Sequence, residues 1–299
     1  MATESLRVAH IRTDDEIALI ANRMRHDIIE MIAASGTGHP GGSLSAADIM
    51  ATLFFSGVMG YDPADPRNPD RDRFILSKGH AAPVLYAVLA QAGYLPKKEL
   101  VSLRKLGSRL QGHPDAHCCP GVEVCTGSLG QGLSISSGVA LGMRLDAARD
   151  GSAPQRMFVL LGDGELQEGE NWEAAMFAAH RRLDNLVAIV DSNNLQIDGH
   201  VCDVCAVEPI DEKFRAFGWH VISCDGHDIA AVRVALNDAV DHEGAPVAIV
   251  CRTVKGKGVS FMEDQASWHG SAPSAEQAAR ALAEIDAAGE QLACAAKEA

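Results

Sequence analysis

Residues 161–194, LGDGELQEGENWEAAMFAAHRRLDNLVAIVDSNN, decide the fold that we predict for this chain. The stretch opens with Gly162-Asp163-Gly164 after an apolar strand and closes with Asp191-Ser192-Asn193-Asn194 after another. A helical segment separates the two strands. A strand, helix and strand in this order form a crossover unit, which brings the carboxyl ends of both strands to one edge of a parallel sheet. We therefore expect Asp163 and Asn193 to lie close together.

The rest of the chain continues this alternation of helices with short apolar strands. We expect strands at 73–77, 156–161, 186–191, 219–223 and 246–251. We expect helices at 14–35, 45–58, 81–93, 97–105, 130–149, 168–180, 208–217 and 228–242, with a long irregular segment at 106–129. Nearly unbroken apolar strands are typical of a sheet that is covered on both faces. The predicted fold class is α/β, with a doubly wound, mainly parallel sheet and helices on both faces.

The composition narrows the classes of partner. The 299 residues carry a formal charge of −14, which argues against nucleic acid or an anionic membrane as the main partner. We find neither the apolar segment of a signal peptide nor a run of 18 apolar residues, and we expect a cytoplasmic protein. Among eight cysteines, only Cys202 and Cys205 have metal-type spacing. We expect reduced, mostly buried thiols rather than structural zinc, and the role of this pair stays open.

The two polar clusters of the opening stretch have the chemistry of a magnesium site. The carboxylate of Asp163, the amide oxygen of Asn193, a backbone carbonyl, water and phosphate oxygens would complete an octahedral shell around Mg²⁺. The alternative for either cluster alone is an ordinary tight turn. Both clusters follow strands at one sheet edge, which favours the metal site.

Four histidines stand beside glycine in non-helical segments: His39, His80, His113 and His269. In loops on the ligand side of the sheet, they are candidates to bind substrate hydroxyls or to move protons. We expect structural roles for His10, His26, His180, His200, His220, His227 and His242, and His117 stays open. The lysines of "KGKGV" (255–259) lack the spacing of a P-loop, and the dinucleotide-binding fingerprint is absent.

Taken together, these segments resemble a known family. GDG followed about thirty residues later by Asn is the pattern of thiamine-diphosphate enzymes. "GTGHPGGSLS", "DRFILSKGHAAPVLYA", "GHPD", "GVEVCTGSLGQGLSISSGVALG", "LQIDG" and "WHG" resemble the N-terminal half of a transketolase. The resemblance implies the thiamine-diphosphate-binding fold, with an extension at 1–13, the diphosphate- and magnesium-binding domain at 14–273 and a helical tail at 274–299.

The resemblance also implies roles for individual residues. Asp163, Asn193 and the main-chain carbonyl of Leu195 match the magnesium ligands, for which Ca²⁺ or Mn²⁺ could substitute. The residues implied to bind thiamine diphosphate are His80, Gly127, Ser128, Leu129, Gly162, Asp163, Gly164, Glu165, Asn193 and His269. The implied catalytic residues are His39, His113 and His269 in the substrate channel, with Glu168 against the glutamate of a partner that activates the aminopyrimidine.

The resemblance implies transfer of a two-carbon ketol unit from a ketose, which we expect to be phosphorylated, to an aldose. The pyrimidine-binding half of a full-length transketolase has no counterpart here. We therefore expect a second chain that carries this half, in an α2β2 assembly. The alternatives are the α subunit of a 2-oxo acid dehydrogenase, a relative of deoxyxylulose-phosphate synthase, and a non-catalytic subunit. The sugar substrates, the pathway and the stoichiometry stay open.

Overall fold

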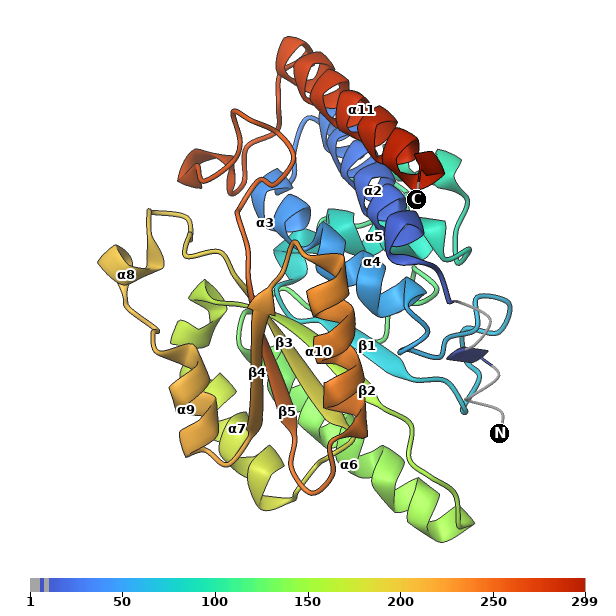
Figure 1. Ribbon diagram of the computed structural model, residues 1–299, viewed down its shortest axis with the longest axis vertical. Coiled ribbons are helices and arrows are strands. Elements are labelled where there is room, and N and C mark those ends of the chain that lie inside the picture. The colour runs from blue at the N-terminus through green and yellow to red at the C-terminus, as the bar shows by residue number, and fades with distance from the viewer. Residues whose placement is uncertain (1–5, 8–10, 299) are drawn as a thin grey trace.

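A five-stranded parallel sheet forms the centre of the computed structural model, which describes residues 6–7 and 11–298 (Figure 1). The strand order is β1-β2-β3-β5-β4, and each neighbouring pair is parallel. The strands are β1 (Arg73–Leu76), β2 (Met157–Gly162), β3 (Leu186–Ser192), β4 (His220–Asp225) and β5 (Val247–Arg252). The predicted mainly parallel sheet is confirmed, and β2 and β3 are neighbours as the crossover unit requires.

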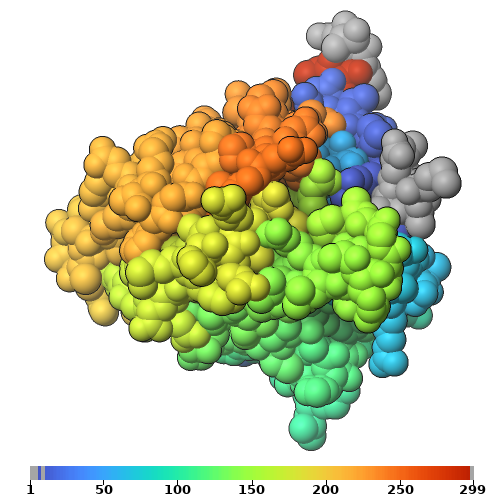
Figure 2. All heavy atoms as spheres, turned by 90° about the horizontal axis from the view of Figure 1, so that it is seen from below, coloured from blue at the N-terminus to red at the C-terminus, as the bar shows by residue number. Residues whose placement is uncertain are grey.

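Helices cover both faces of the sheet. One face packs on α2 (Asp14–Ser35), α4 (Ala47–Phe55), α5 (Ala82–Gln91) and α10 (Ile229–Asp241). The other packs on α6 (Gln131–Asp150), α7 (Gly169–His180) and α9 (Ile210–Ala216), whose surfaces lie side by side in green, yellow and orange in Figure 2. Successive strand residues point to opposite faces: Phe158 and Leu160 join the first core, and Val159 and Leu161 the second. This alternation of fully buried residues produces the three-layer fold.

The N- and C-terminal parts of the described chain meet on the outside of the first layer. Helix α2 begins at a capping box, in which the Thr13 side chain and Glu16 bond each other's backbone N–H groups, and it ends at Gly36 in the left-handed conformation. Helix α11 (Ala275–Glu298) packs along α2, burying Ala281 and Ile285 (Figure 1). Within residues 6–7 and 11–298, no helix is long and apolar enough to cross a membrane.

Three sequence predictions need correction. The segment expected as one helix at 45–58 contains α4, and a separate short helix, α3 (Pro40–Ser45), lies between the expected helices 14–35 and 45–58, where no helix was expected. Burial of all six α3 residues, with Pro40 at the first turn, overrides the low helical propensity of glycine. Residues Lys97–Ser102 form a 3₁₀ helix, and the expected α-helix at 97–105 is absent from this segment. The cysteines are not mostly buried, since five of the eight are exposed.

The remaining elements are short and lie near the carboxyl edge of the sheet. They are α8 (Val201–Val204) and the 3₁₀ turns Gly79–Ala81, Gly164–Gln167 and Ala266–Trp268. Ligands of doubly wound sheets bind outside the carboxyl ends of the strands, so these turns lie where a site is expected.

Candidate active site

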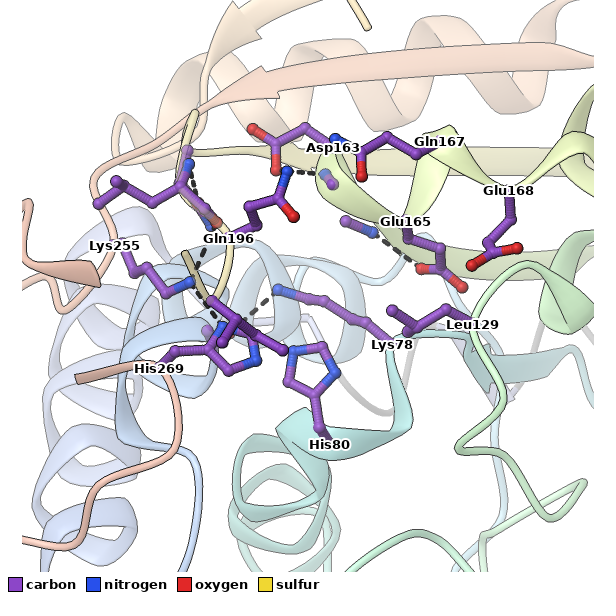
Figure 3. Close-up of a pocket in the computed structure, with 16 residues that line it drawn as sticks. Lys78, His80, Leu129, Asp163, Glu165, Gln167, Glu168, Gln196, Lys255 and His269 are labelled. Carbon is purple, nitrogen blue, oxygen red and sulfur yellow. Dashed lines mark hydrogen bonds between the residues drawn. The ribbon is translucent and has the colours of Figure 1, made fainter. Parts of the chain in front are cut away.

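The carboxyl ends of four strands surround a cavity of about 220 Å³ (Figure 3). Lys78 follows β1, Asp163 follows β2, Asn193 follows β3 and Lys255 follows β5. Figure 3 shows Lys78, Lys255, His80 and His269 on one side of the cavity and Asp163, Glu165 and Glu168 on the other. The cavity is lined by Gly42, Lys78, His80, Leu129, Gly162, Asp163, Gly164, Glu165, Gln167, Glu168, Asn193, Leu195, Gln196, Ile197, Lys255 and His269.

Asp163 is buried, and backbone N–H groups hold its carboxylate at the cavity wall. Gly164 N donates to Oδ1 at 2.7 Å, and Asn194 N donates to Oδ2, so the turn after β3 is bonded to the turn after β2. Burial and the negative charge of Asp191 raise the pKa of Asp163 to about 6. These two effects outweigh the backbone N–H groups and the nearby Lys78, which lower the pKa.

The turn after β3 supplies two further oxygens. Asn193 Oδ1 accepts from Leu195 N at 3.1 Å, which orients the amide. The Leu195 carbonyl accepts from Lys255 Nζ at 3.0 Å, and the same Nζ lies 2.9 Å from His269 Nδ1. Burial and the charge of Lys78 lower the pKa of Lys255 to about 8. These two effects outweigh Asp163 and Asp191, which raise the pKa of Lys255.

Lys78 belongs to a buried network beneath the cavity. Its Nζ bonds the carboxylate of Asp191 and donates to the Gly42 carbonyl at 3.0 Å. Asp191 is fully buried and also accepts from the hydroxyls of Ser45 and Thr253. Burial raises the pKa of Asp191, but Lys78 outweighs burial and the pKa lies below its usual value. This network links segments that are far apart in the sequence.

The four glycine-flanked histidines form one cluster. The His80 and His269 rings lie 4.9 Å apart, and His39 lies 5.3 Å from His80, 5.6 Å from His269 and 6.4 Å from His113. Burial, followed by the charge of Arg104, lowers the pKa of His39 to about 4. Burial and Lys255 lower that of His269 to about 3. The rings of His39 and His269 are therefore neutral at physiological pH, with one donor and one acceptor nitrogen each.

The segment 126–132 lies against the same edge. A Cβ on Gly79 would come within 2.8 Å of the Thr126–Gly127 backbone, and one on Gly127 would lie 3.1 Å from the His113 ring. Leu129 lines the cavity, whereas Ser128 is exposed. Ser128, Gly127, His39 and His113 are outside the cavity lining, although the last two belong to the histidine cluster.

The two glutamates after β2 differ in their surroundings. Glu165 is buried and accepts from Ser77 Oγ, Gly130 N and Gly162 N, so its carboxylate is bonded within the protein and fixes the segment before α6. Glu168 is exposed at the mouth of the cavity, beside Gly130. Glu168 is thus accessible to a partner, as the resemblance implies.

Sequence reasoning missed Lys78, Lys255, Asp191 and Gly42 as site residues. A signal was present, because "SKGH" and "VKGKG" each place a lysine within three residues after a strand of the parallel sheet. The same rule that singled out Asp163 and Asn193 also selects these lysines.

Comparison with known proteins decides the family. The sequence profile described as "Transketolase, thiamine diphosphate binding domain" matches residues 17–288. The chain belongs to the transketolase family. This transketolase chain is 43% identical to the 6-deoxy-6-sulfo-D-fructose transketolase subunit SqwG of Clostridium sp. (strain MSTE9), over 90% of this chain and 96% of that protein. It is 41% identical to an apulose-4-phosphate transketolase subunit of Actinobacillus succinogenes, over 91% of this chain and 96% of that protein.

Other relatives are longer than this transketolase chain. Human transketolase is 46% identical over 89% of this chain, which spans 41% of that protein. The solved structure of transketolase from Campylobacter jejuni superposes with a TM-score of 0.86 and 33% identity, covering 92% of this chain and 43% of the other. The chain therefore corresponds to transketolase N-terminal subunits, and the alternative of a 2-oxo acid dehydrogenase α subunit is set aside.

Proposed function

We propose that this chain binds the diphosphate end of thiamine diphosphate through Mg²⁺ and transfers ketol groups together with a second, C-terminal subunit. The main support for this proposal is that the buried Asp163 carboxylate and the oxygens of Asn193 and Leu195 lie together at the cavity. Three hard oxygen donors of this kind suit Mg²⁺, with water and phosphate oxygens in the remaining positions.

The donor set also fits an anion beside the metal ion. Lys78 and Lys255 line the cavity, and Gly42, Gly162 and Gly164 let a ligand approach the backbone closely. Lys255 is buried within the field of Lys78, and a diphosphate would bring negative charge to both lysines. His80 and His269 lie at the same end and would donate to phosphate oxygens.

The proposed mechanism divides the work between cofactor and protein. Thiamine diphosphate, when bound, supplies the chemistry that breaks and forms the carbon–carbon bond. The rings of His39, His113 and His269 lie together, and those of His39 and His269 are neutral. These residues would therefore bind sugar hydroxyls and move a proton between a ring nitrogen and a sugar oxygen. Arg104, 3.4 Å from His39 Nδ1, orients that ring.

A partner subunit follows from the size and the openness of the site. A cavity of about 220 Å³ is smaller than the roughly 300–1,000 Å³ of complete small-molecule pockets, so it suits one end of the cofactor. Glu168 and Ile197 are exposed at its mouth, available to a second chain. We propose a pyrimidine-binding C-terminal partner, an α2β2 assembly and a cytoplasmic location.

The proposed donor is a ketose, and the two subunit relatives suggest its class. Their names refer to a sulfonated hexulose and to a phosphorylated pentulose, which share an anionic group distant from the carbonyl. Assays of the assembled enzyme with a sulfonated, a phosphorylated and an uncharged ketose separate these classes. Decarboxylation of 2-oxo acids without any ketol transfer would contradict the proposal.

The binding proposal is tested by Asp163→Ala in the assembled enzyme. We expect Mg²⁺-dependent affinity for thiamine diphosphate to fall at least about 100-fold, because a direct ligand is lost. Asp198→Ala is the control, since this carboxylate is exposed in the same turn region. Unchanged affinity in Asp163→Ala would exclude the metal site.

A further inference from the structure

Three potential metal ligands converge in the segment that joins His113 to Gly127, outside the cavity, and a fourth lies beside one of them. They are Asp115, His117, Cys118 and Cys125, in the pattern Asp-x-His-Cys-x₆-Cys. The ligand atoms of Asp115, His117 and Cys125 lie within 4.8 Å of one another. Both thiols bond the same carboxylate: Cys125 Sγ lies 3.4 Å from Asp115 Oδ1, and Cys118 Sγ lies 3.4 Å from Oδ2.

We propose that these four residues bind a soft divalent cation, with Zn²⁺ as the best fit. Two thiolates, an imidazole and a carboxylate form the tetrahedral ligand set that zinc prefers. Around a tetrahedral zinc, Zn–S and Zn–O bonds of ordinary length separate sulfur from oxygen by about 3.5 Å. Each thiol lies 3.4 Å from a different oxygen of Asp115, so each sulfur is already at nearly this separation from the carboxylate.

The backbone prepares the cluster for a cation. His117 N donates to Asp115 Oδ1 at 2.8 Å, which fixes the carboxylate in its turn. Cys118 is exposed, whereas the neighbouring Cys119 is buried and its thiol faces the Pro120 carbonyl, so only the first of the pair faces the cluster. His117 and Cys125 are also exposed, which leaves the cation a path from solvent.

Binding of Zn²⁺ releases protons and leaves the net charge of the four residues with their cation unchanged. Each thiol gives up a proton to solvent as its sulfur replaces a zinc-bound water, so Zn²⁺ takes the place of two protons. Because protons are released on binding, we expect affinity to increase with pH. No redox partner is needed for this exchange.

A cation here would join the two ends of the loop 113–127, namely residues 113–118 and residues 125–127. Asp115, His117 and Cys118 belong to the first end of the loop and Cys125 to the second. The two ends are already joined by a hydrogen bond in which Thr126 N donates to the Pro114 carbonyl at 3.3 Å. The residues that adjoin this hydrogen bond are His113 and Gly127, and the His113 ring packs against Gly127. The cation would therefore restrain His113, a member of the four-histidine cluster, without contacting it. This inference holds whether or not the chain transfers ketol groups.

The experiment uses the full chain with a thiol-free reductant and excess Mg²⁺, so that hard oxygen sites are occupied. We expect one equivalent of Zn²⁺ to bind, and Co²⁺ at the same site to give a thiolate charge-transfer absorption. Cys118→Ser/Cys125→Ser keeps the hydrogen bonds to Asp115 but loses both thiolates, and we expect at least about 100-fold weaker affinity. Hydrogen exchange of residues 113–127 should slow with Zn²⁺ in the unmodified chain but not in Cys118→Ser/Cys125→Ser.

Cys202→Ser/Cys205→Ser is the matched control, because this pair is also exposed and has metal-type spacing. We expect it to retain the Zn²⁺ site unchanged. Binding that survives in Cys118→Ser/Cys125→Ser, or that is lost in the control, would overturn the assignment. So would the absence of a zinc equivalent in the reduced, unmodified chain.

Discussion

At the scale of single residues, the floor of the site holds two buried aspartates with opposite surroundings. Asp191 bonds Lys78, Ser45 and Thr253, whereas the hydrogen bonds of Asp163 come from two backbone N–H groups. One carboxylate is neutralised by the protein, and the other faces the cavity. Function and stability therefore make different demands on two side chains of the same type.

These surroundings predict opposite effects of two identical substitutions. Asp163→Asn removes an uncompensated charge, and we expect the free energy of unfolding of the cofactor-free chain at neutral pH to rise by about 1–3 kcal/mol. Asp191→Asn leaves Lys78 buried without its carboxylate, and we expect a fall of about 3–5 kcal/mol. Urea unfolding measures both. Equal destabilisation by the two substitutions would show that the buried charge of Asp163 does not lower the stability of the fold.

A third aspartate predicts a pH dependence away from the cavity. Asp48 accepts from both terminal nitrogens of Arg25 and from His227 Nδ1, while His227 Nε2 accepts from Val254 N. This network joins α2 and α4 to the turn before Lys255. Burial raises the pKa of Asp48, but Arg25 and His227 outweigh burial and the pKa lies below its usual value.

The sign of the Asp48 effect follows from its lowered pKa. The carboxylate stabilises the fold fully above its unfolded-state pKa of about 4, and this contribution is lost as pH falls through the lower folded-state pKa. We expect Asp48→Asn to be destabilising at pH 7, and the difference from the unmodified chain to shrink below about pH 4. Urea unfolding at several pH values measures it. A difference that grows on acidification would contradict the network.

At the scale of elements, close packing fixes the start of α6 beside β1. A Cβ on Gly132 would lie 2.7 Å from Ser77 Cα, and Gly132 N donates to Ser77 Oγ at 3.1 Å. Ser77 also bonds Glu165, so this contact positions the segment that contains Leu129. The helix can approach the strand end this closely because Gly132 has no side chain.

Two glycines of α6 provide a matched comparison. We expect Gly132→Ala to lower the free energy of unfolding by about 1–3 kcal/mol, because backbone atoms must move apart. Gly138 is exposed in the same helix with no atom near its Cβ position, and Gly138→Ala should add about 0.5–1 kcal/mol through helical propensity. Chemical unfolding of both variants checks this. A stabilising Gly132→Ala would contradict the close contact.

The elements also show how far the sequence alone leads. Apolar runs predicted the parallel strands, and the crossover rule predicted that Asp163 and Asn193 meet, as their turns do through the Asn194–Asp163 hydrogen bond. The α3 helix was not predicted, because its glycines disfavour helix and only tertiary burial explains it. The Lys78–Asp191 pair was also missed, since 113 residues separate its members and Lys78 must reach from the end of β1 past β2 to β3.

At the scale of the whole molecule, the cofactor site is one-sided. The strand ends, both lysines and the proposed metal ligands gather on one small cavity, and Glu168 stands at its rim. If the chain holds only the diphosphate, the organic part of thiamine diphosphate adds little to binding until a partner covers it. The affinity for pyrophosphate and the affinity for thiamine diphosphate should therefore be similar in this chain alone and differ once the partner is bound.

Competition between pyrophosphate and thiamine diphosphate measures this separation. With Mg²⁺ and this chain alone, we expect the two Kd values to agree within about tenfold, because the same donors bind both. After the partner subunit is added, thiamine diphosphate should gain at least about 100-fold while pyrophosphate stays nearly unchanged, since contacts to the aminopyrimidine then contribute about 2.7 kcal/mol or more. Asp163→Ala should weaken both ligands alike. Strong selectivity of the isolated chain for thiamine diphosphate would mean that it holds the whole cofactor by itself.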